Sequence, residues 1–201
     1  MCSIVKSKMI KSSILIFFLL AGSSVYAQFN VTIQWQPIKP GKAGDTIYYD
    51  RERKLDWPDF KGRPVAASPA AAITESGFGY KMSVQSRNKR TNVVITVFCY
   101  FNKQHSWVKE DMDNYYALLH EQHHYDITYI NACLFVQKLK EARFNSGNYN
   151  YLVQKIHDES FDALDKMQDE YDGETSNGRI SRKQKAWNKK IDQQLEALII
   201  N

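Results

Sequence analysis

The segment 120–124, with the sequence HEQHH, contains the residue types of a metal-dependent hydrolytic site. Residues four positions apart lie on the same face of an α-helix, so His120 and His124 would stand one above the other. Two imidazoles placed in this way can bind one Zn²⁺ ion, and Glu121 would lie beside the attacking water as general base. His123 would point about 100° away from His124 and would not share its metal. The segment therefore predicts two zinc ligands and one catalytic carboxylate.

A third zinc ligand is expected, because a catalytic zinc ion usually takes three protein ligands and leaves one position for water. The run NSGN at 145–148 breaks the helical pattern, and the helices on its two sides are expected to pack antiparallel. Folding the chain at residue 146 sets position 122 opposite position 170, with Glu170, Asp172 and Glu174 in that neighbourhood. Glu170 and Glu174 share one helical stripe with Met167, so either of these two glutamates is the expected ligand.

His157 has the chemistry of a zinc ligand but an unsuitable place in the chain. The same folding sets it opposite residue 135, about 20 Å along the helix from the histidine pair at a rise of 1.5 Å per residue. We therefore expect His157 at the surface or at the edge of the core, outside the metal site.

The first 27 residues have the organisation of a secretory signal peptide. Lysines at positions 6, 8 and 11 precede the apolar run 14–20, and the tripeptide VYA at 25–27 offers the small residues that a signal peptidase recognises. The apolar run is too short to span a bilayer comfortably. The sequence therefore predicts a signal peptide at 1–27 and a single domain at 28–201, exported to the periplasm or the medium and without a membrane span after cleavage.

The charge balance gives little support to nucleic-acid binding. The whole chain has 27 basic and 22 acidic residues, but removal of the predicted signal leaves 24 against 22. The basic cluster of Arg87, Lys89 and Arg90 is interpreted as the solvated tip of a hairpin. The expected partner is a peptide or protein substrate, and the sequence does not define an oligomeric state.

Two cysteines follow the predicted signal, Cys99 in a predicted strand and Cys133 in a predicted helix. An oxidising exterior would permit one disulfide between them. Two buried free thiols fit the pattern equally well. Neither cysteine has the sequence surroundings of a catalytic nucleophile.

The N-terminal half of the predicted domain is expected to be rich in β-strands that help to position the candidate site. Alternation of apolar and polar residues predicts a strand at 29–35, and β-branched and aromatic residues predict strands at 80–86 and 93–101. A turn at Asn88 and Lys89 is expected to join the last two into an antiparallel hairpin. By analogy with other zinc peptidases, strand 93–101 could offer an edge on which an extended substrate adds by backbone hydrogen bonds.

The second half is predicted to be helical. A long helix is expected from about Trp107 to Arg143 with Ser106 as its N-cap, and a second helix from about Tyr149 to Tyr171. Ser181 and Gln184 form a capping-box pattern at the start of a last helix. The predicted fold class is α+β: an N-terminal antiparallel hairpin or small sheet packed on a C-terminal helical hairpin that carries HExxH, in a zincin-like arrangement, followed by a C-terminal helix.

Five segments occur in order between Leu55 and Trp187: LDWPDFKGRP, AAITESGFGY, FNKQHSWV, LLHEQHHYDIT and QDEYDGETSNG. Together they resemble a bacterial family that is catalogued as a domain of unknown function and described as predicted secreted Zn-dependent proteases. The resemblance implies a zincin-like metallopeptidase. It also implies that His120 and His124 are zinc ligands and that Glu121 is the catalytic carboxylate.

The resemblance extends to the residues after the second predicted helix. The segment YDGETSNG is similar to the family pattern YDxETxHG: Asp172, Glu174 and Thr175 match it, and Asn177 stands at the position of the His. Asp126 matches the Asp of the family's HEQxHxD segment. Because Asp126 lies about 200° around the helix from the second zinc-binding histidine, we expect it to make a structural hydrogen bond.

The expected function is hydrolysis of peptide bonds by an exported zinc metallopeptidase. Glu121 would take a proton from the zinc-activated water and pass it to the leaving amine. Tyr171 or His123 could stabilise the oxyanion, although a packed aromatic at the helix end is the simpler interpretation of Tyr171. The alternative is a non-catalytic exported envelope or binding protein whose HExxH segment is relict or holds a structural metal.

Overall fold

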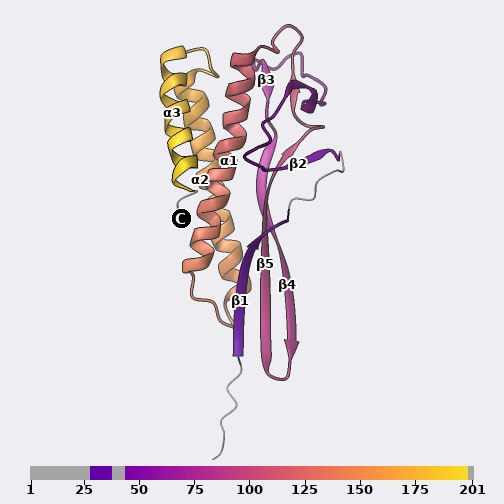
Figure 1. Ribbon diagram of the computed structural model, residues 1–201, viewed down its shortest axis with the longest axis vertical. Helices are drawn as coiled ribbons and strands as arrows, with labels where there is room; N and C mark the ends of the chain where they lie inside the picture. The colour runs from indigo at the N-terminus through magenta and orange to yellow at the C-terminus, as the bar shows by residue number, and fades with distance from the viewer. Residues whose placement is uncertain (1–27, 38–43, 199–201) are drawn as a thin grey trace, which may run out of the picture.

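A computed structural model describes residues 28–37 and 44–198 of the chain, and the predicted signal peptide lies outside these residues. The fold is α+β, as predicted, with a sheet on one side and helices on the other (Figure 1). The elements in chain order are β1 (Gln28–Trp35), β2 (Thr46–Tyr48), η1 (Trp57–Asp59), β3 (Ala72–Ile73), β4 (Ser76–Arg87), β5 (Arg90–Asn102), β6 (Trp107–Val108), α1 (Tyr115–Glu141), α2 (Tyr149–Thr175) and α3 (Ser181–Ala197).

The larger sheet is four-stranded and is organised around β5. The predicted hairpin is confirmed: β4 pairs antiparallel with β5 along its whole length, and Asn88 and Lys89 turn the chain with φ of 50° and 60°. The other edge of β5 pairs with β1, which runs parallel to it, and then with β2, which runs antiparallel. The sheet is therefore mixed. Because β5 has partners on both edges, the expectation that residues 93–101 offer a free edge to a substrate is wrong.

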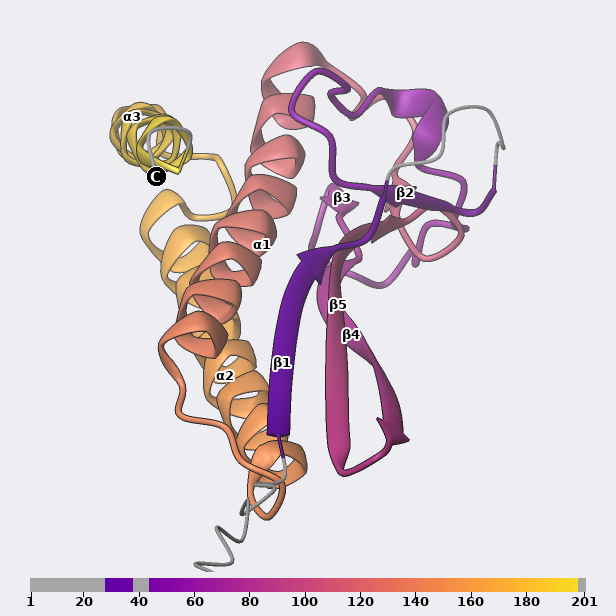
Figure 2. The same cartoon turned by 60° about the horizontal axis from the view of Figure 1, so that its bottom comes forward.

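Helix α1 lies between the sheet and the other two helices (Figure 2). Alternate residues of β5, such as Ile95 and Phe101, are buried on the face that packs against it, since side chains alternate across a strand. On α1 itself, Ile127 and Phe135 are fully buried. The helix is covered on two sides, so polar residues placed on it can be held in a buried environment.

The first helix begins later than the sequence predicts. It starts at Tyr115, and Asn114 caps it by accepting a hydrogen bond from the backbone N–H of Ala117 at 3.0 Å. Ser106 is not the N-cap, because its hydroxyl donates to the carbonyl of Asn102 at 2.7 Å. The two residues after it form β6, which pairs with β3 in a separate two-stranded sheet. The apolar residues at 107–108 thus belong to a strand, and tertiary pairing overrides the local helical signal.

The helical hairpin agrees with the predicted folding of the chain. Helix α2 packs along α1, and residue 135 lies opposite His157, with the ring centroids 5.5 Å apart. Helix α3 starts at Ser181, but Ile180 is the N-cap and provides no side-chain hydrogen bond, so the predicted capping box is wrong. None of the helices in the described part of the chain is long and apolar enough to cross a bilayer.

Both described cysteines are free thiols in the structure. Burial raises the pKa of Cys99 well above its ordinary value and, despite a hydrogen bond to Tyr129, raises the pKa of Cys133 to about 11. Neither thiol is therefore a ready thiolate at neutral pH.

Candidate metal centre

Three side chains from α1 and α2 converge in one place: His120, His124 and Asp172. The Nε2 atoms of the two imidazoles are 3.1 Å apart. Oδ1 of Asp172 lies 3.1 Å from Nε2 of His120 and 3.0 Å from Nε2 of His124. Within the described residues, this is the group of His, Cys, Asp or Glu side chains that lie close enough together to hold one metal ion.

A glutamine on α2 fixes the tautomer of His124. The side-chain Nε2 of Gln168 donates to the carbonyl of His124 at 2.9 Å and to the hydroxyl of Thr128 at 3.2 Å, which sets the orientation of its amide. Its Oε1 lies 2.6 Å from Nδ1 of His124 and can only accept a hydrogen bond. Nδ1 therefore carries the proton of the neutral ring, and the lone pair of Nε2 faces Asp172.

A second glutamine, from α3, does the same for His120. Gln184 is almost fully buried, and its Nε2 donates to the hydroxyl of Tyr171 and to Oδ1 of Asn188. Its Oε1 lies 2.9 Å from Nδ1 of His120, so the Nε2 of this ring also presents a lone pair. The ring of Tyr171 stacks on His120 with the centroids 4.7 Å apart. Both imidazoles are thus oriented by contacts with protein side chains.

The arrangement demands a positive charge at its centre. Two Nε2 lone pairs and one carboxylate oxygen face each other at 3.0 to 3.1 Å, which is favourable only with a proton or a cation among them. Burial alone would lower the pKa of His124, but its hydrogen bond to Asp172 and the charges of Glu121 and Asp172 raise this pKa to about 9. Burial would raise the pKa of Asp172, but the two histidines hold it well below its usual range.

The separations of the three atoms fit a tetrahedral zinc ion. Zinc binds imidazole nitrogen and carboxylate oxygen at about 2.0–2.2 Å, which places neighbouring ligand atoms of a tetrahedron about 3.3 Å apart. The observed separations of 3.0 to 3.1 Å are close to that value. Two neutral imidazoles and one carboxylate are also the donor set of a zinc site with one open position.

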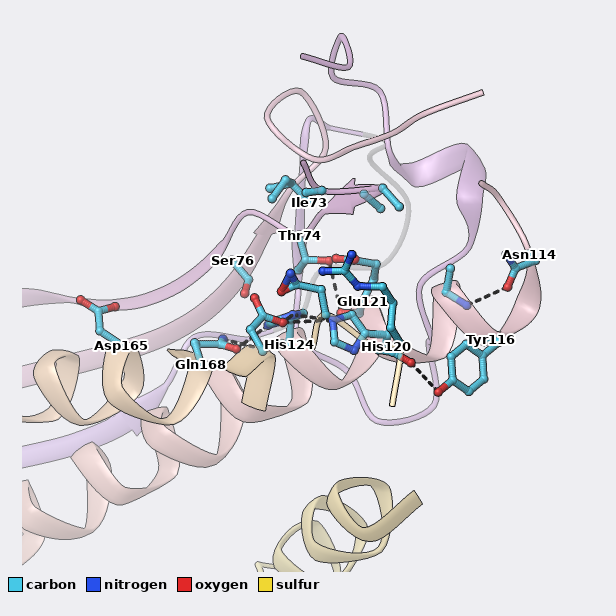
Figure 3. Close-up of a pocket in the computed structure, with 18 of the residues that line it drawn as sticks. Ile73, Thr74, Ser76, Asn114, Tyr116, His120, Glu121, His124, Asp165 and Gln168 are labelled. Atoms are coloured by element: carbon cyan, nitrogen blue, oxygen red, sulfur yellow. Dashed lines mark hydrogen bonds and ion pairs between the residues drawn. The ribbon is translucent and has the colours of Figure 1, made fainter. Parts of the chain in front are cut away.

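The three side chains line a cavity of about 400 Å³ that also contains Glu121 (Figure 3). Glu121 is 5% exposed and lies on α1 next to His120. The hydroxyl of Thr74, another lining residue, donates to the backbone carbonyl of Glu121 at 3.2 Å and attaches the segment after β3 to α1. The remaining lining includes Ala70, Ala71, Ala72, Ile73, Ser76, Asn114, Tyr116, Ala117, Phe161, Leu164, Asp165, Gln168, Asn177, Gly178 and Arg179.

The structure does not bring either predicted third ligand to the histidines. Glu170 is exposed and lies 3.9 Å from the ammonium of Lys166, and Glu174 is exposed and lies 3.1 Å from that of Lys183. Asp172 takes the place instead. The folding about residue 146 is confirmed, because it sets position 172 opposite 120 and position 168 opposite 124. The face assigned to α2 is not confirmed, because the stripe that faces the site is 164, 168 and 172 rather than 167, 170 and 174.

Two residues have the structural roles that the sequence predicted. Oδ1 of Asp126 accepts hydrogen bonds from the hydroxyl of Tyr49 at 2.7 Å and from Nε2 of Gln122 at 3.0 Å, inside the core. His157 lies at the edge of the core, where its ring packs edge-on against Phe135. Neither belongs to the group of side chains that could hold a metal ion.

The predicted oxyanion stabilisers do not line the cavity. The hydroxyl of Tyr171 is turned to the backbone carbonyl of His120 at 3.4 Å, as a packed aromatic would be. Nδ1 of His123 lies 2.7 Å from the carbonyl of Leu119, and His123 is not among the residues that line the cavity. Asn177 does line the cavity, with a left-handed φ of 51°, but it is not a member of the metal-binding group.

Sequence reasoning missed the two glutamines and assigned Gln184 to a helix cap. An amide side chain has no spacing rule that marks it as a partner of a metal ligand. The available signal was position: Gln168 lies opposite His124 in the folding about residue 146.

Comparison of the chain with protein-family models, with curated protein sequences and with solved structures gave no match. The resemblance to secreted zinc-dependent proteases therefore stays a prediction.

Proposed function

We propose that this chain is a zinc-dependent metallopeptidase. The observation that carries the proposal is the convergence of the Nε2 atoms of two imidazoles and one carboxylate oxygen beside Glu121, in a cavity of about 400 Å³. A bound zinc ion would supply Lewis acidity, polarising the scissile carbonyl and lowering the pKa of water to about 7. The protein would position the metal ion and the substrate, and it would transfer the proton.

Glu121 is the residue that would move the proton. Glu121 belongs to the cavity lining and follows a proposed metal ligand directly in the sequence. It would accept the proton of the attacking water and deliver it to the leaving amine, a role that contributes about 10²–10⁴ in rate. His120, His124 and Asp172 would hold the metal, with Gln168 and Gln184 keeping the two rings in the tautomer that binds it.

Strand β3 would align the substrate. It pairs with β6 on one edge, and the described residues add no strand to its other edge. Residues 70–74 line the cavity, and Thr74 is bonded to the backbone carbonyl of Glu121. An extended peptide that adds to this edge by backbone hydrogen bonds would cross the metal centre. The sequence led us to expect this substrate-pairing role for strand 93–101, and we now propose it for β3.

The test combines metal content with peptide hydrolysis. The purified protein should contain about one zinc ion per chain and should cleave fluorescein-labelled casein. Glu121→Gln should keep the zinc and reduce cleavage by about a hundredfold or more, because only the proton acceptor is removed. Asp172→Asn should lose zinc, whereas Glu170→Gln, two residues away on the same helix, should behave as the wild type. Full activity of the metal-free protein would contradict the proposal.

A bound zinc ion without hydrolysis by the wild type would favour the alternative, a non-catalytic exported protein with a structural metal. In that case four protein ligands should close the site. With the predicted signal peptide, either protein would act in the periplasm or the medium.

A further inference from the structure

Arg179 is the one lysine or arginine among the described residues that line the cavity. Its Nε donates to the carbonyl of Ser176 at 2.9 Å, which anchors one edge of the guanidinium. No carboxylate of the described residues pairs with this guanidinium. The acidic residues of the cavity, Glu121, Asp165 and Asp172, do not neutralise it directly. The cavity therefore holds a cation whose terminal N–H groups are available to a ligand.

The loop that carries Arg179 is fixed to the metal centre. Ser176, Asn177 and Gly178 all have left-handed φ, of 52°, 51° and 78°. The hydroxyl of Tyr116 donates to the carbonyl of Gly178 at 2.6 Å, and the N–H of Gly178 donates to the hydroxyl of Thr175 at 3.1 Å. The first bond attaches the loop to the first turn of α1, and the second attaches it to the end of α2. The backbone that leads into Arg179 is thus held at the Tyr116 end of the cavity.

The direction of β3 determines which end of a bound peptide would lie near the guanidinium of Arg179. Figure 3 shows Asp165 at one end of the cavity and Tyr116 at the other, with the histidines between them. Thr74 is bonded to residue 121 of α1, and Ser76 to residue 128. The chain from β3 into β4 therefore runs away from the Tyr116 end. A peptide that adds antiparallel to β3, the more stable pairing, would place its C-terminal side at the Tyr116 end, beside Arg179.

We propose that Arg179 selects substrates that carry a carboxylate on the C-terminal side of the scissile bond, an inference that rests on the proposed peptidase function. A guanidinium offers parallel N–H donors that match the two oxygens of a carboxylate. The carboxylate has two possible sources, the free C-terminus of a peptide or the side chain of an Asp or Glu residue. Both present the same group to Arg179.

The test is the affinity of the zinc-loaded Glu121→Gln protein for a set of acetylated hexa-alanine peptides, measured by calorimetry. The peptides end in a free acid, end in an amide, or end in an amide and contain one Glu or one Gln. We expect the free acid or the Glu peptide to bind about tenfold more tightly than its neutral counterpart. The free acid and the Glu peptide distinguish the two sources of the carboxylate.

The preference should disappear when Arg179→Gln is added and should persist with Arg182→Gln, an exposed arginine of α3 that does not line the cavity. Equal affinity for charged and neutral peptides would overturn the inference, as would the absence of binding by any of them. A preference that survives Arg179→Gln would also overturn it, because the metal would then be the group that binds the carboxylate. Failure of the peptidase proposal would appear separately, as zinc-loaded wild type that does not cleave casein.

Discussion

Replacement of Gln168 by Met tests whether the metal centre depends on a fixed imidazole tautomer. Met has nearly the length of Gln, but its thioether is only a weak acceptor for the N–H of Nδ1 of His124, which lies 2.6 Å from the amide oxygen of Gln168. Without that acceptor, the neutral ring can place its proton on Nε2. The nitrogen that faces Asp172 would then have no lone pair for a metal ion.

The expected loss of zinc affinity follows from two independent magnitudes. Removing a hydrogen-bond partner of a metal-binding His typically weakens metal binding about 10–100-fold, which corresponds to about 1.4–2.7 kcal/mol. Leaving one buried donor without its acceptor costs about 1–3 kcal/mol. The two ranges agree, so Gln168→Met should bind zinc between ten and a hundred times more weakly than the wild type.

The assay is a competition titration against a chromophoric zinc chelator at fixed pH, with circular dichroism to confirm that each variant is folded. Gln137→Met is the matched control, because Gln137 is exposed on α1 and bonds only to Glu141 among the described residues. The control should keep the wild-type affinity. An affinity of folded Gln168→Met within twofold of the wild type would refute the tautomer argument.

Three further outcomes are expected. Without metal, His124 has a pKa of about 9, so below that pH zinc must displace a proton from this ring. The apparent affinity for zinc should therefore rise by up to about tenfold per pH unit from pH 7 and level off near pH 9. Zinc titrations at a series of pH values would show this. Gly178→Ala should lower the free energy of unfolding by about 1–2 kcal/mol in a urea titration, because φ is +78° and a Cβ would stand 3.4 Å from Nδ1 of His120. Tyr49→Phe takes one hydrogen bond from the buried Asp126 and should cost about 1–3 kcal/mol in the same measurement, while zinc affinity stays unchanged.

The elements that the sequence predicted well are those with strong periodicity. The hairpin of β4 and β5 has β-branched and aromatic residues and a two-residue turn, and both signals are local. The fold-back of α2 on α1 follows from one loop and the rise of a helix. Folding the chain about residue 146 sets position 122 opposite position 170. The same folding predicts the observed contacts of 120 with 172 and of 124 with 168.

The errors have a common physical cause in tertiary contacts that leave no local pattern. Residues 107–108 pair with β3 and so do not extend α1. The face of α2 that meets the histidines depends on its rotation about its own axis, and a rotation of about 100° exchanges one residue for the next. That rotation decides between Asp172 and the exposed Glu170 and Glu174. Spacing along the chain does not fix it.

The proposed function requires one zinc ion between the two imidazoles and the carboxylate of Asp172. The most direct test is a crystal of the zinc-loaded protein with anomalous diffraction at the zinc absorption edge. We predict one peak, about 2.0–2.1 Å from Nε2 of His120 and of His124 and about 2.0–2.2 Å from a carboxylate oxygen of Asp172. A peak that lies elsewhere, or zinc-loaded crystals with no peak between these side chains, would contradict the account.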